Sequence, residues 1–141
     1  MCEKLRHVEL NEGLESLGKT ENACLQNPED KTFCGSRIEN IRIPSTLKVV
    51  GHDTFRFCES LKRVEFAEGT ESLGKDDENS DGWQSCFEFS SIEEVVFPGT
   101  LKEVWPDIFK YCKSLKTVRV AKDCPVCVEK LVGSNVEVRR E

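Results

Sequence analysis

The chain contains the same stretch of sequence twice. Residues 2–19 read CEKLRHVELNEGLESLGK, and residues 58–75 read CESLKRVEFAEGTESLGK, with twelve identical residues in eighteen aligned positions. Internal repetition on this scale is typical of proteins that stack one small structural unit many times. The repeated unit therefore determines the fold, and the spacing of its apolar residues defines the unit.

That unit carries the motif Leu/Ile-x-x-Val/Ile-x-apolar, which occurs five times. Its first positions are Leu5, Ile38, Leu61, Ile92 and Leu115, so the repeats begin near residues 5, 38, 61, 92 and 115. Apolar residues that alternate over three to five positions predict short strands, and the Gly or Pro after each one predicts a turn. Because a single unit cannot bury its apolar face, stacked units would align these residues in continuous columns. The pattern predicts a solenoid with a parallel sheet on one face.

An aromatic segment ends each short unit, DTFRFCESL in one case and DIFKYCKSL in the other. Asp53 and Asp107 are suited to cap a helix N-terminus, so we expect one helical turn in each segment. Cys58 and Cys112 each lie three residues before the leading Leu of the next unit, and Cys2 has the same spacing. Since free Cys is among the most buried residue types, we expect these three side chains to pack in the core.

The pattern L-x-x-V-x-IP-x-x-L-x-x-V-G-x-x-x-F-x-x-C-x-x-L can be followed across residues 38–61 and, less completely, across residues 92–115. It resembles the BspA-like branch of the leucine-rich repeat family, and the resemblance covers nearly the whole chain. The resemblance implies a right-handed, β-rich α/β repeat solenoid. It also implies a non-catalytic protein–protein interaction module, because such repeats generally serve as binding scaffolds. The inserts at residues 19–31 and 75–85 depart from the family pattern.

Composition points to a single domain spanning residues 1–141. Hydrophobic residues make up 38% and charged residues 33% of the chain, a balance typical of folded proteins. The net charge of −6 argues against a nucleic-acid groove, which requires clustered Lys and Arg. No secretory signal is visible and no apolar run is long enough to cross a bilayer. We therefore expect a cytoplasmic protein, or a cell-surface one if the chain is a fragment of a longer secreted protein.

One loop matches a metal-binding motif. The stretch DENSDGWQSCFE fits the calcium-loop pattern D-x-[DN]-x-[DN]-G-x5-E at every fixed position. The calcium ligands would be Asp77, Asn79, Asp81 and Glu88, which supply the hard oxygens that calcium binds. No amphipathic helices flank the loop, and the usual apolar eighth position holds Gln84. A solvated acidic loop without a cofactor is therefore the favoured interpretation, and a calcium site is the alternative.

Cys124 and Cys127 form a CxxC pair after the last repeat strand. A structural role in the terminal cap is favoured, with thiol-redox or metal chemistry as the alternative. Redox use would require a helix N-terminus that stabilises the first thiolate, and no second CxxC or nearby His completes a zinc site. His7 and His52 are the only histidines, and neither has a nucleophile at motif spacing. The sequence accordingly predicts no enzymatic activity.

A column of residues on the exposed side of the predicted sheet alternates in charge. Glu9, Arg42, Glu65, Val96 and Arg119 occupy the same position in successive units, so opposite charges would lie side by side in the first three. The column is either a self-satisfied charge ladder or a docking face for a partner, with Val96 as an apolar interruption. The predicted binding face comprises His7, Glu9, Arg42, Arg63, Glu65, Glu94, Val96 and Arg119.

The two ends of the repeat array differ. Residues 121–141 are expected to cap the solenoid, because Leu131 and Val132 can cover the last repeat strand and Val138 lies in a polar-faced closing segment. The first strand, which carries Val8, would have an open edge instead. We therefore expect a contact at that edge, either with a second copy of the chain in a homodimer or with an N-terminal portion of a longer parent.

Overall fold

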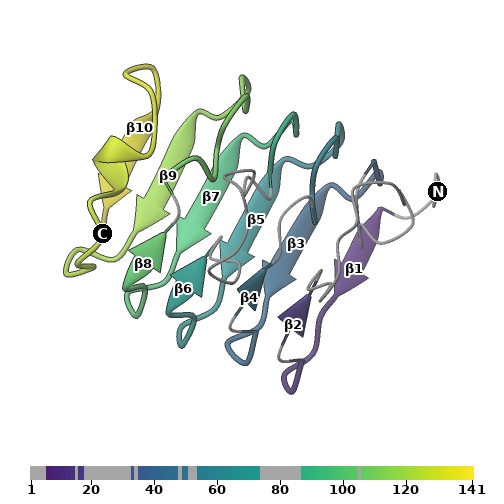
Figure 1. Cartoon of the computed structure of the whole chain (residues 1–141), viewed down its shortest axis with the longest axis horizontal. Helices are drawn as coiled ribbons and strands as arrows, with labels where there is room; N and C mark the ends of the chain where they lie inside the picture. Colours follow the sequence, from purple (N-terminus) through teal and green to yellow (C-terminus); the bar gives the residue numbers. More distant parts are fainter. Residues whose placement is uncertain are drawn as a thin grey trace, which may run out of the picture.

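A computed structural model of the chain shows one large parallel sheet (Figure 1). The structure describes residues 6–14, 16–17, 33, 35–47, 49–50, 54–73, 87–104 and 106–141. Six long strands form the sheet: β1 (His7–Glu9), β3 (Asn40–Ile43), β5 (Arg63–Phe66), β7 (Glu94–Phe97), β9 (Thr117–Val120) and β10 (Glu137–Arg140). Their order is β1-β3-β5-β7-β9-β10, and every neighbouring pair is parallel. The predicted β-rich repeat solenoid is confirmed.

The motif residues of successive units lie side by side in this sheet. The central apolar column runs in register through Val8, Ile41, Val64, Val95, Val118 and Val138. Because successive side chains of a strand point to opposite faces, one face of each strand enters the core and the other faces outward. In β5, β7 and β9, buried residues alternate with half-buried ones. The alternation of apolar and polar residues in the sequence therefore corresponds to the alternation of side chains between the inner and outer faces of the sheet.

Four short strands accompany the long ones: β2 (Ser16–Leu17), β4 (Val49–Val50), β6 (Ser72–Leu73) and β8 (Glu103–Val104). They pair in parallel as β2 with β4 and β6 with β8, and they lie in the lower part of Figure 1. Leu73 in β6, together with Leu47 before β4 and Leu101 before β8, is buried in the core. The units that contain β1, β3, β5 and β7 thus each combine a long strand with a short one.

A stack of phenylalanine rings runs through the interior. Phe33, Phe55, Phe87 and Phe109 come from consecutive units and stack with ring centroids 5.6, 5.4 and 6.1 Å apart. Phe55 and Phe87 are fully buried. Parallel, offset rings at these separations are a favourable arrangement of aromatic pairs. The stack therefore ties each unit to the next through the core.

The aromatic segments themselves are turns, and the expected helical turns are wrong for the described residues. The Cys58 N–H donates to the Phe55 carbonyl at 3.3 Å, and the Cys112 N–H donates to the Phe109 carbonyl at 3.0 Å. Each segment then reverses through a residue with positive φ, 55° at Phe57 and 59° at Tyr111, where a right-handed helix cannot continue. Asp53 lies outside the described residues.

Within the described part of the chain, the only helix is the 3₁₀ turn η2 (Val128–Lys130). No helix in that part is long and apolar enough to cross a membrane.

The C-terminal segment adds the last strand of the sheet. β10 pairs in parallel with β9, and Val136 and Val138 pack against the core as half-buried residues. The Arg140 guanidinium fastens this strand to the preceding loop: it donates to the carbonyl oxygens of Cys124 at 3.2 Å and Val126 at 3.0 Å, and to the Glu129 carboxylate at 2.8 and 3.1 Å. The cap is therefore held by sheet pairing on one side and by one arginine on the other.

Candidate protein-interaction face

The outward-facing residues of the six-stranded sheet form two columns. The first contains His7, Asn40, Arg63, Glu94, Thr117 and Glu137, and the second contains Glu9, Arg42, Glu65, Val96, Arg119 and Arg139. All eight residues of the predicted binding face belong to these columns. The structure thus brings them together on one surface, and their part in binding stays a prediction.

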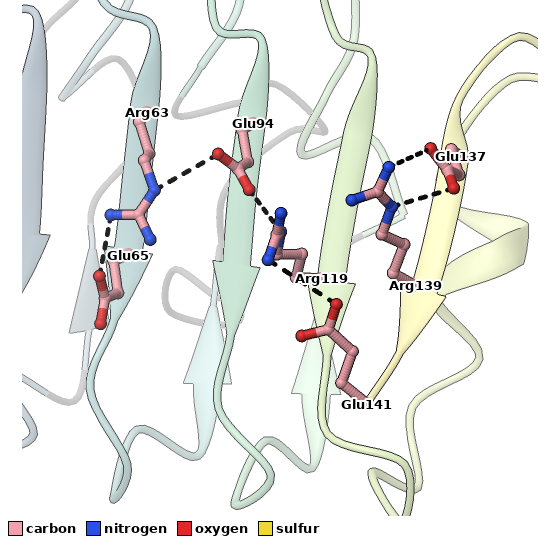
Figure 2. A network of polar contacts seen from close by, with 7 residues as sticks. All are labelled: Arg63, Glu65, Glu94, Arg119, Glu137, Arg139 and Glu141. Atoms are coloured by element: carbon pink, nitrogen blue, oxygen red, sulfur yellow. Dashed lines mark hydrogen bonds and ion pairs between the residues drawn. The ribbon is translucent and has the colours of Figure 1, made fainter.

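Ion pairs cross this surface from β5 to the end of the chain. Figure 2 shows the Glu94 carboxylate between two arginines of neighbouring strands, 3.4 Å from Arg63 Nε and 2.6 Å from Arg119 Nε. The network continues through the pairs Arg63–Glu65 at 2.9 Å and Arg119–Glu141 at 3.7 Å, and a separate pair joins Arg139 to Glu137 at 2.9 Å. Opposite charges on adjacent strands stabilise the sheet, whereas like charges would repel.

The network supports the charge-ladder interpretation for this half of the surface. Each exposed pair contributes only about 0.2–1 kcal/mol, and a connected network constrains the side chains more than isolated pairs do. A partner that docked here would have to compete with ion pairs already formed within the chain. Val96, half-buried in register between Glu65 and Arg119, is the apolar interruption of this region.

The other half of the surface contains a cavity. Its volume is about 440 Å³, and it is open to solvent. It is lined by His7, Val8, Glu9, Leu10, Asn11, Glu12, Arg42 and Pro44. The Arg42 side chain is 71% exposed, and its Nε lies 3.9 Å from the Glu65 carboxylate, a looser pair than those of the network. Three residues of the predicted binding face therefore border a hollow that also offers apolar side chains.

The calcium prediction falls mostly outside the described residues. Asp77, Asn79 and Asp81 are not described, and only Glu88 can be placed. Glu88 is buried, with 6% of its surface exposed, and its Oε2 lies 3.2 Å from Arg56 Nε. As a bidentate calcium ligand, Glu88 would have to exchange this ion pair for the metal. The calcium site stays a prediction.

The cysteines of the repeat occupy the core to different degrees. Cys58 is fully buried, which confirms its prediction, and its Sγ–H donates to the Phe33 carbonyl at 3.0 Å. Cys112 makes the equivalent bond to the Phe87 carbonyl at 3.0 Å but is half-buried. Burial raises the pKa of the Cys112 thiol to about 11. Cys2 lies outside the described residues.

The thiols of the CxxC pair face different surroundings. Cys124 is buried, with its Sγ 3.7 Å from the Leu101 carbonyl oxygen, whereas Cys127 is exposed, with its Sγ 3.6 Å from the Glu129 carboxylate. The following helix η2 has three residues. In the part of the chain that the structure describes, no three His, Cys, Asp or Glu side chains are grouped as metal ligands. Redox use of the pair stays a prediction.

One surface feature escaped the sequence reasoning. Phe57, Phe89 and Tyr111 are exposed and stack in a second aromatic column outside the buried one. The signal was present as an aromatic residue two positions after each buried phenylalanine, in FRFC, FEFS and FKYC. The helical turns predicted for DTFRFCESL and DIFKYCKSL would not place residues two positions apart on one face.

Comparison with known proteins places the repeat in context. A family model described as "BspA type Leucine rich repeat region (6 copies)" matches residues 26–125, which include strands β3 to β9. No curated protein matches the chain, and no solved structure matches it.

Proposed function

Because the chain belongs to the BspA-type leucine-rich repeat family, we propose that it is a non-catalytic module that binds a partner protein through the outward face of its six-stranded sheet. Repeats of this family suggest a protein-interaction scaffold, and the extended surface of a solenoid suits that use. The observation that supports the choice of surface is the cavity bordered by His7, Glu9 and Arg42.

The distribution of charge favours this end of the face over the other. Between β5 and β10 the carboxylates and guanidinium groups are engaged with one another. At the cavity, Arg42 extends into solvent beside Glu9, and Leu10 and Pro44 supply apolar surface. Apolar surface with a few oriented polar groups is the usual composition of a recognition site.

The edge of the sheet adjoins the same cavity. β1 pairs with β3, and no other described strand pairs with β1. An edge strand presents unpaired N–H and C=O groups to which another strand can be added. A second copy of the chain, or a segment of a longer parent, docked at this edge would lie beside His7 and Glu9, so the two modes of contact use one surface.

Site-specific photocrosslinking tests the proposal. A benzoylphenylalanine placed at His7 or at Arg42 should crosslink a partner protein, or a second copy of the chain, in a lysate of the source cells. The control position is Lys130, an exposed residue of η2 at the opposite end of the sheet. Crosslinked products of defined mass that form from positions 7 and 42 but not from position 130 would support the proposal. Arg42→Glu should also reduce the yield of the product from position 7. Equal products from position 130, or none from the face, would contradict it.

A further inference from the structure

Three exposed aromatic side chains form a continuous stack along one flank of the solenoid. The rings of Phe57 and Phe89 lie 5.2 Å apart at 5°, and those of Phe89 and Tyr111 lie 5.0 Å apart at 6°. Their exposed fractions are 45%, 42% and 51%. The residues lie in the turns that precede β5, β7 and β9, away from the face formed by the strands themselves. We name Phe57, Phe89 and Tyr111 the outer ring column.

The backbone does not favour aromatic residues at these positions. All three have positive φ, 55°, 56° and 59°, a region that glycine adopts far more readily than side chains with a Cβ. The preceding unit has Gly35 at the equivalent corner, with φ of 67°. The Gly35 N–H donates to the Arg56 carbonyl at 2.9 Å, just as the Phe57 N–H donates to the Glu88 carbonyl at 3.1 Å. Glycine therefore adopts the same backbone conformation and makes the same hydrogen bond at this turn. Exposed aromatic residues held in a strained backbone conformation are typical of functional sites.

The outer ring column ends at Tyr111, because the next unit supplies no ring. No residue after Tyr111 is aromatic, and the segment that follows β9 is the C-terminal cap. Phe89 stacks on the Tyr111 ring, and the cap residue Leu131 lines a hollow beside that ring.

A cavity of about 440 Å³ lies at this end of the column. Its lining combines the aromatic turn with the cap: Phe109, Tyr111, Cys112, Lys113, Leu115, Leu131, Val132, Gly133, Asn135 and Val136. The aliphatic residues Leu131, Val132 and Val136 are half-buried and line the same cavity as Tyr111. A volume of this size accommodates an aromatic side chain, which gains favourable contacts from stacking on one side and aliphatic packing on the other.

The charge beside the cavity is positive. Lys113 lines it, and the Lys110 ammonium lies 5.5 Å from the centroid of the Tyr111 ring. The chain as a whole carries a net charge of −6, whereas the only charged residue among those that line this hollow is a lysine, Lys113. A carboxylate next to an incoming aromatic side chain would be attracted to this rim.

We propose that this cavity binds an aromatic side chain of a partner protein, adjacent to a carboxylate, which continues the outer ring column by stacking on Tyr111. The bound ring would take the position that a fourth unit would otherwise fill, and Lys113 would contact the carboxylate. The residues that line the cavity precede β9 and β10, so this contact is separate from the sheet face proposed above, and either can exist without the other.

The test uses small probes and methyl-resolved NMR of the full chain. N-acetyl-tryptophan, with its free carboxylate, should shift the methyl signals of Leu131, Val132 and Val136 upfield in a saturable manner, with a dissociation constant in the millimolar range. N-acetyl-tryptophanamide should bind several-fold more weakly, and 0.5 M NaCl should remove that difference because the lysines are exposed. N-acetyl-leucine should produce no ring-current shift and at least tenfold weaker binding.

Variants locate the contact and keep the test independent of folding. Tyr111→Leu, which retains bulk without a ring, should weaken N-acetyl-tryptophan binding at least tenfold, whereas Phe57→Leu at the far end of the column should leave binding unchanged. Both variants should show the circular dichroism spectrum of the wild type. Non-saturable shifts, equal binding of N-acetyl-leucine, or equal losses in the two variants would overturn the proposal. If the sheet-face crosslinks form while these probes fail, only the aromatic cavity is excluded.

Discussion

The rings of Phe89 and Tyr111 lie parallel, with centroids 5.0 Å apart, although both residues have the positive φ that disfavours them. Their backbone places them at equivalent corners of adjacent units, and the corner projects each side chain over its neighbour. Stacking of such rings contributes about 0.5–1.5 kcal/mol per pair, which is comparable with the roughly 1–2 kcal/mol that an L residue loses in the left-handed region. The exposed column is therefore close to neutral in stability, unlike the buried one.

At position 57, a glycine variant should be more stable than an alanine variant, which reverses the usual order of stability. Phe57→Ala loses the stacking but keeps the unfavourable φ, whereas Phe57→Gly relieves the backbone. We expect Phe57→Gly to be more stable than Phe57→Ala by about 1 kcal/mol and within about 1 kcal/mol of the wild type. Phe55→Ala, in the buried column, should cost about 3–5 kcal/mol. Urea unfolding of the variants measures these differences, and Phe57→Ala more stable than Phe57→Gly would show that the corner does not require positive φ.

The Cys112 thiol should make the stability of the fold depend on alkaline pH. Its pKa is raised to about 11 by burial, whereas the unfolded thiol titrates near 8.5, so between these values the folded state holds more protons. The free energy of unfolding should therefore fall as pH rises from about 8.5 to 11, by up to about 3 kcal/mol. Cys112→Ser cannot titrate in this range and is the control, since Ser90 occupies the same corner in the neighbouring unit. Equal pH dependence in wild type and Cys112→Ser would contradict the assignment.

Loss of the Arg140 contacts should loosen the C-terminal cap. Arg140 donates hydrogen bonds to Glu129, and these lower the pKa of that carboxyl to about 2. Because the folded pKa is lowered, the stabilisation is present above about pH 4.3 and is lost as pH falls toward 2. Both groups are substantially exposed, so solvent screens the ion pair and its contribution to stability is small.

Amide hydrogen exchange of β10 measures the effect of this cap. Arg140→Ala should accelerate exchange of β10 amides more than of β5 amides at pH 7. Glu129→Gln should show a smaller acceleration, because the Arg140 bonds to the Cys124 and Val126 carbonyls survive. The difference between wild type and Glu129→Gln should shrink below pH 4. Unchanged protection of β10 in Arg140→Ala would mean that sheet pairing alone holds the cap.

Calcium should raise the melting temperature if Asp77, Asn79, Asp81 and Glu88 form the predicted site, because a ligand that binds only the folded state stabilises it. Glu88→Gln alone is an ambiguous test, since Glu88 is also paired with Arg56. Asp77→Ala is the sharper variant, because Asp77 holds the position of the pattern that accepts only Asp, and it should abolish the calcium-dependent shift. No shift at millimolar calcium in the wild type would exclude the site.

Strand β1 should govern self-association if a second copy binds at its edge. Val8→Lys places a charge in the half-buried central column and should abolish any dimer seen by sedimentation velocity at high micromolar concentration. Glu103→Lys, on the exposed side of β8, is a control that adds a lysine without touching β1. If the wild type sediments as a monomer at every concentration, the homodimer is excluded and the edge of β1 could bind only a different partner.

Much of the fold was determined by the sequence alone. Ile41, Val64 and Val95 recur at the same place in each unit, and parallel pairing of identical units leaves one register that buries all of them. The membership of the binding face follows from the same period of two, since residues such as Arg42 and Glu65 must point opposite to the core. These features depend on local spacing, which a sequence displays directly.

Only the tertiary structure decided what happens between the strands. The Phe57 N–H bonds to the carbonyl of Glu88 in the next unit, and the segment turns to make that bond where local preferences suggested a helix. The same turn places Phe57 outside the core. Distances between side chains on neighbouring strands decide which outward-facing charged residues form ion pairs and which border the cavity. Spacing along the chain identifies which residues face outward, but contacts between units determine which of them are already engaged.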